Sequence, residues 1–165
     1  MVRRALLAGA LWAAWMPALA ASAPDPLAEL PRTVRKRLVT FEKAIERHDW
    51  PEAVGYFDPS NHAAQHKIFF SLEHNADPLD PGDPEAQAAF TEWYILGALG
   101  LWDYEGPPTD LDDVTDLRFG KLEKQGGPTA PVRIRLDIDT RVGPRPGILV
   151  VDPVTGAISG PPPEE

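Results

Sequence analysis

The feature that most constrains the fold of this sequence is a change in the spacing of its apolar residues near Gly106-Pro107-Pro108. Before this point apolar residues recur every three or four positions, as they do along the buried side of an α-helix. After it they recur at every second position, as they do along a half-buried β-strand. Helices followed by consecutive strands predict an α+β domain, with N-terminal helices packed on a curved antiparallel sheet of three to four strands.

Two helices are expected at the start of the helical half. The first is predicted from apolar residues that share one helical side, namely Val34, Leu38, Phe41 and Ile45. The second is short and begins after Asp49, because Pro51 stands near its start and Glu52 follows Asp49 at the spacing of a capping box.

Two further helices should begin at Asp-Pro pairs, in which Asp can cap the helix and Pro suits its first turn. The pair at 58–59 opens a helix to about His74, with a buried side formed by Ile68, Phe69 and Leu72. After a proline-rich loop, the pair at 83–84 opens a helix that stops near Gly100. Its apolar residues at helical spacing are Ala86, Phe90, Trp93, Tyr94 and Gly97.

The strand half predicts strands at 114–124, 132–142 and 148–151, and a short return strand at 157–159. In the second strand, apolar residues up to Val142 alternate with charged ones, so one face should be apolar and the other charged. Because 148–151 is apolar throughout, we expect that strand to be covered on both faces.

The N-terminus has the layout of a secretory signal peptide, with Arg3 and Arg4 before an apolar stretch that Pro17 interrupts. Small residues place cleavage near Ala20 or Ala23, which predicts a periplasmic or secreted chain with no stable membrane insertion afterwards. The organisation expected is a signal peptide at 1–23, a proline-rich linker at 24–31, one domain at 32–160 and a flexible tail at 161–165.

Composition narrows the classes of function. The formal net charge of −9 disfavours sequence-independent binding to nucleic acid, since acidic proteins repel phosphate backbones. The absence of Cys excludes disulfides and thiolate chemistry in this sequence. It contains no phosphate-binding glycine loop and no nucleophile elbow, so we expect no cofactor and no serine hydrolase.

The order of these features resembles the nuclear transport factor 2-like, cystatin-like α+β roll superfamily. The resemblance extends over about 32–160 and rests on FEKAIERHDW and YFDPSN, followed by DLDDVTDLRFGKLEKQGG, VRIRLDIDTRV and GILVVDPVTGAISG. It implies a long helix, a short helix and a curved sheet, in a family whose members bind small apolar molecules or dimerise. Members that are enzymes place Asp, His or Tyr inside the roll, and no residue here matches such a motif.

Aromatic residues are the candidates for a ligand pocket. They are Tyr56, Trp93, Tyr94, Trp102 and Tyr104, of which the last four surround the end of the last helix. Such side chains can line an apolar pocket and orient a ligand with their polar tips. The alternative is that they form part of the packed core.

Histidines and charged residues suggest three further hypotheses. His48 or Asp49 could act as a general base beside an aromatic wall. His62 and His66 have the i, i+4 spacing that lets two imidazoles share a metal on a helix, with Asp58 or His48 as a third ligand, or they are ordinary helix residues. The charged face of the second strand could pair with a symmetric copy in a homodimer, or simply face water; it carries Arg133, Arg135, Asp137, Asp139 and Arg141.

The acidic run at 110–116 lacks the EF-hand pattern and is better explained by turn solvation. Together these observations favour an exported, non-catalytic domain that binds a small apolar ligand or an envelope protein. The alternatives are an isomerase or dehydratase with a His/Asp acid–base group, and a His-based metal-binding protein.

Overall fold

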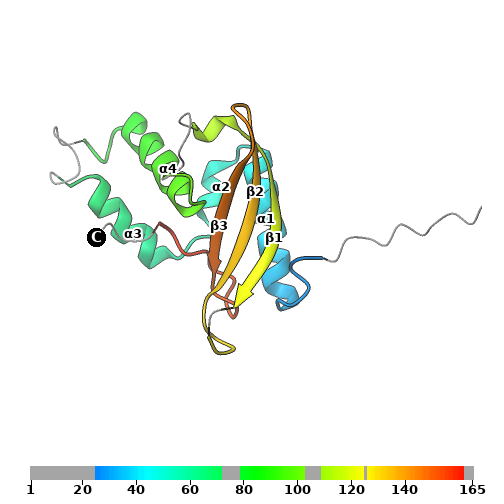
Figure 1. The fold of residues 1–165 in the computed structure, drawn as a ribbon. Coiled ribbons are helices and arrows are strands. Elements are labelled where there is room, and N and C mark those ends of the chain that lie inside the picture. Colours follow the sequence, from blue (N-terminus) through cyan, green and yellow to red (C-terminus); the bar gives the residue numbers. More distant parts are fainter. Residues whose placement is uncertain (1–24, 72–78, 103–108, 125, 162–165) are drawn as a thin grey trace, which may run out of the picture.

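The computed structural model describes residues 25–71, 79–102, 109–124 and 126–161 (Figure 1). In order they form α1 (Arg32–Glu46), α2 (Trp50–Val54), α3 (Pro59–Phe69), α4 (Pro84–Ala98), the 3₁₀ turn η1 (Leu111–Asp113), β1 (Val114–Lys124), β2 (Val132–Thr140) and β3 (Arg145–Val151). The strands form one antiparallel sheet in the order β1-β2-β3. The predicted α+β class is confirmed.

Helix α1 covers one face of this sheet and lies behind it in Figure 1. Its apolar stripe is buried as predicted, with Ala44 added to it. The stripe meets the inward side chains of the strands, among them Leu117, Ile134, Leu136 and Leu149. Burial of these large apolar side chains is the main force that holds helix and sheet together.

Three aspartates cap the helices at the predicted starts. Asp49 accepts a hydrogen bond from the backbone N–H of Glu52 at 3.2 Å, Asp58 from that of Ser60 at 2.7 Å, and Asp83 from that of Glu85 at 3.1 Å. Each bond satisfies a backbone donor that the first helical turn leaves free. Gly100, with φ of +75°, follows the last residues of α4, where the stop was expected.

Helix α3 is shorter than predicted and buries less. It ends at Phe69, and its buried residues are Gln65 and Phe69. Ile68 is 36% exposed, because the side of α3 that packs on α4 is formed by His62, His66 and Phe69, so its predicted burial is wrong. Leu72 and His74 lie outside the described residues.

Two expectations for the strands are also wrong. β2 ends at Thr140, and Val142 lies in the following turn with 43% of its surface exposed. β3 alternates between buried and exposed residues, with Ile148 42% exposed, so it is not covered on both faces. The reason is that no described helix packs on the outer face of the sheet.

Segments at both ends of the described chain contribute to the core. Leu27 and Leu30, in the segment interpreted as a linker, are only 3% and 5% exposed. The predicted return strand is reduced to Ile158, which bridges both Val151 and Phe57.

The predicted signal peptide and residues 162–165 lie outside the described residues. No described helix is both long and apolar enough to span a bilayer.

Candidate functional site

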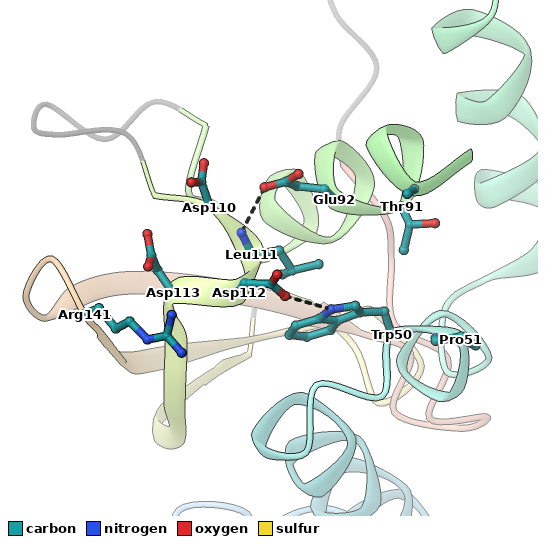
Figure 2. A pocket seen from close by; sticks show the side chains of 10 residues that line it. Trp50, Pro51, Thr91, Glu92, Asp110, Leu111, Asp112, Asp113 and Arg141 are labelled. Atoms are coloured by element: carbon teal, nitrogen blue, oxygen red, sulfur yellow. Dashed lines mark hydrogen bonds between the residues drawn. The ribbon is translucent and has the colours of Figure 1, made fainter. Parts of the chain in front are cut away.

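The most prominent pocket in the described part of the chain lies where α2, α4 and η1 meet (Figure 2). Its volume is about 680 Å³, and it opens to solvent. The lining residues are Trp50, Pro51, Ala88, Thr91, Glu92, Asp110, Leu111, Asp112, Asp113 and Arg141. They come from segments far apart in the sequence, so the pocket exists only in the folded chain.

Trp50 forms the largest apolar wall of the pocket and is held on two sides. Its indole stacks on the imidazole of His48 with ring centroids 5.0 Å apart and planes inclined by 19°. Its Nε1–H donates to Asp112 Oδ1 at 3.3 Å (Figure 2). His48 Nε2 in turn donates to the carbonyl oxygen of Val114 at 2.8 Å, which links this wall to the start of β1. The indole is therefore positioned before any ligand arrives.

The rest of the rim is mainly acidic. Four carboxylates, those of Glu92, Asp110, Asp112 and Asp113, face one guanidinium, that of Arg141. Glu92 accepts a hydrogen bond from the backbone N–H of Leu111 at 3.0 Å, which fixes η1 against α4 (Figure 2). At neutral pH the pocket thus carries an excess of negative charge next to an aromatic surface.

The aromatic residues predicted from the sequence to form a pocket lie elsewhere. Trp93 and Trp102 pack on each other with centroids 4.5 Å apart, and Trp102 Nε1–H donates to the carbonyl oxygen of Trp93 at 2.8 Å. The indole of Trp102 also lies over Gly97, so closely that an added Cβ would be 2.3 Å from two of its ring atoms. These contacts make the pair part of the packing at the end of α4.

Tyr94 is fully buried in the contact between α3 and α4. Its hydroxyl donates to Asn61 Oδ1 at 3.0 Å, and burial raises the pKa of the phenol well above its usual value. Tyr56 lies under Arg37, whose guanidinium carbon is 5.1 Å from the ring centroid, and donates to Glu52. None of these predicted aromatic residues lines the pocket beside α2, and Tyr104 lies outside the described residues.

His62 and His66 face α4 rather than open solvent. His62 makes edge contacts with Phe90 and Tyr94, at 5.2 and 5.0 Å between centroids. Burial, and then the charge of His66, lower its pKa. His66 Nε2 accepts a hydrogen bond from Gln87 Nε2 at 3.1 Å, which occupies the lone pair a metal would need. Across the described ranges, no three His, Asp or Glu side chains are grouped to hold a metal ion.

His48 and Asp49, the candidate acid–base residues, both hold backbone groups. His48 adopts a φ of +55°, uncommon for a residue with a side chain, and it binds Val114 as described above. Asp49 caps α2. His48 nevertheless stacks on Trp50 and therefore lies next to the pocket. Their proposed catalytic role remains a prediction.

Sequence reasoning missed Trp50 and the acidic side chains as a site. In the sequence the run at 110–116 is explained by turn solvation, and Trp50 is far from the aromatic cluster at the end of α4. The sequence holds one signal of the site. Trp50 directly follows Asp49, which caps α2, and the acidic run leads into β1. Trp50 and the acidic residues come together only because α2 packs near η1. The two segments are so far apart in the sequence that this packing could not be predicted from it.

Comparison of the chain with protein-family models, with curated proteins and with solved structures finds no match. The resemblance to the nuclear transport factor 2-like superfamily therefore remains a prediction, and the site must be interpreted from its own chemistry.

Proposed function

We propose that this chain is an exported binding domain whose pocket between α2, α4 and η1 holds a small ligand with an apolar body and a positive charge. The observation that carries the proposal is the fixed indole of Trp50 beside an excess of carboxylates. The sequence predicts a small apolar ligand, and the carboxylates of the pocket lead us to expect that this ligand also carries a positive charge.

The size of the pocket suits a small molecule. Pockets that hold small ligands typically measure about 300–1,000 Å³, and this one measures about 680 Å³. An apolar ring or chain would lie against Trp50, Pro51 and Ala88. Because the indole is already held by His48 and Asp112, little conformational entropy would be lost on binding.

The charge of the rim sets the sign of the preferred ligand. A cation gains from Asp112 and Glu92, and from the face of the Trp50 ring through cation–π attraction. An anion would meet four carboxylates and only one guanidinium, so it should be rejected. Since the pocket is open, each charge contributes about 0.2–1 kcal/mol, or up to about fivefold in affinity.

The experiment uses two probes that differ in charge, 2-phenylethylammonium and phenylacetate. The readout is the indole N–H resonance of Trp50 in two-dimensional NMR, identified by its loss in Trp50→Phe. We expect a saturable shift with the cation and none with the anion. Asp112→Asn together with Glu92→Gln should weaken binding of the cation by about tenfold, at about threefold for each carboxylate.

Glu46→Gln is the matched control, because Glu46 is an exposed carboxylate at the end of α1 and does not line the pocket. It should leave the affinity unchanged. Equal affinity for both probes, or the absence of any shift of the Trp50 resonance, would contradict the proposal.

A further inference from the structure

The outer face of the sheet, opposite α1, carries an ordered pattern of charge. Figure 1 shows this face turned toward the viewer, and no described helix crosses it. On β2 the residues that point to this face are Arg133 and Arg135, followed by Asp137 and the half-buried Asp139. Two positive charges are therefore followed by two negative charges along one strand, with Leu136 at the midpoint.

A column of apolar residues runs beside these charges on β3. Pro146, Ile148 and Val150 pair in register with Asp137, Arg135 and Arg133 and point to the same face. Ile148 is 42% exposed, which is unusual for a large apolar residue in the middle of a strand of this sheet. The outer face thus combines an apolar column with a charged column, as do surfaces that bind other proteins.

We propose that the outer face of the sheet binds a second copy of this chain, around a twofold axis that lies across β2 near Leu136. Rotation about that axis reverses the strand, so Arg135 meets the partner's Asp137, and Arg133 meets the partner's Asp139. The charge order on β2 is complementary to itself in this arrangement alone. With the two β2 strands parallel, each charge would meet its own copy and be repelled.

The same rotation places β3 over the partner's β3. Ile148 then lies near Pro146 of the partner subunit, and the two apolar columns cover each other. Burial of these columns supplies the attraction, while the charges select the orientation. The interface would be isologous, which is the commonest arrangement in homodimers.

Three ion pairs within one chain lie on this face. Arg135 Nε lies 2.8 Å from Glu123 Oε1, and Arg118 lies 3.0 Å from Asp139 and also pairs with Asp116. All three pairs are at least partly exposed, so each contributes little to stability. The guanidinium of Arg135 keeps further donors for a second acceptor. Arg135 also neutralises Glu123, which the rotation places over the acidic end of the partner's β1. Because β1 therefore adds little attraction, β2 and β3 supply the contact.

The test is the mass of the purified chain from Pro24 onward, which retains every described residue, measured by sedimentation over a range of concentrations. A monomer–dimer equilibrium is expected. Asp137→Arg and Arg135→Asp should each raise the dimer dissociation constant at least tenfold, because each places like charges in contact. The combined variant Arg135→Asp/Asp137→Arg should restore the dimer, since the opposed charges are then only exchanged.

Ile148→Asp should also dissociate the dimer. Its matched control is Val154→Asp, because Val154 is an apolar residue in the turn after β3, outside the sheet, and is 63% exposed. Circular dichroism establishes that each variant is folded. A chain that stays monomeric throughout overturns the proposal. So does a dimer that survives the single charge reversals, or one that the combined variant does not restore.

Discussion

The closest contact at the end of α4, between Gly97 and the indole of Trp102, allows a quantitative prediction for Gly97→Ala. An added Cβ would lie 2.3 Å from Trp102 Cε2 and Cζ2 and 2.8 Å from Cδ2. Carbon atoms in contact stay about 3.5–4.0 Å apart, so the indole must move by more than 1 Å, on the order of that difference. The ring cannot move so far and keep its present partners.

The cost follows from the contacts that Trp102 would lose. Its ring contact with Trp93 is worth about 0.5–1.5 kcal/mol, and its hydrogen bond to the carbonyl oxygen of Trp93 contributes a similar ~0.5–1.5 kcal/mol. Alanine regains about 1 kcal/mol of helix propensity relative to glycine. The net loss of unfolding free energy is about 1 kcal/mol, or roughly 2–4 °C in the melting temperature.

Thermal unfolding followed by near-ultraviolet circular dichroism measures this change, because the two tryptophans in contact contribute to that signal. Gly127→Ala is the control: a Cβ there meets no atom within 4 Å, so its effect should be close to zero. In a Trp102→Ala background the clash disappears, and Gly97→Ala should then stabilise the helix by up to ~1 kcal/mol. Destabilisation by Gly97→Ala in that background would refute the reasoning.

Three further substitutions test the packing around the sheet and α3. Tyr94→Phe removes the hydrogen bond to Asn61 and should cost about 1–2 kcal/mol of unfolding free energy, measured by chemical denaturation; no loss would mean that water replaces the hydroxyl. Gly147→Ala places a Cβ 2.6 Å from the carbonyl oxygen of Leu99 and should cost at least ~2 kcal/mol, with a lower melting temperature as its readout. The lowered pKa of His62 means that the folded state favours the neutral ring, so stability present above pH 6.5 is lost as the pH falls through the folded pKa. His62→Gln should flatten this decline of the melting temperature with acid, whereas an unchanged slope would assign the decline to other groups.

The parts of the fold that depend on local patterns could be predicted from the sequence. Asp49, Asp58 and Asp83 cap the helices where the Asp and Pro spacing placed them, since a cap depends on residues only two or three positions apart. The alternation along β2 likewise identified its buried face, because the period of a strand is a local property.

The errors arose where burial depends on a distant element. Ile148 is apolar, but whether its side is covered depends on a layer that the described part of the chain does not supply. Ile68 lies on a helix whose apolar residues define no clear face, so only the position of α4 decides which side is buried. Residue type alone could not settle either case.

The candidate site was missed for a related reason. Trp93 and Trp102 are close in sequence, which predicts an aromatic cluster, yet that proximity lets them pack on each other and leaves no room for a ligand. Trp50 and Asp112 are separated by 62 positions, and their hydrogen bond forms only when α2 and η1 pack together. A pocket assembled from such distant segments has no signature in the spacing of residues.

The central claim is that the ligand lies beside Trp50 and not beside the tryptophans at the end of α4. Intermolecular nuclear Overhauser effects from the ring protons of bound 2-phenylethylammonium measure this directly. We expect them to reach the methyl groups of Leu111 and Ala88, which line the pocket with Trp50. Effects to the indole protons of Trp93 and Trp102, with none to Leu111 or Ala88, would contradict the claim.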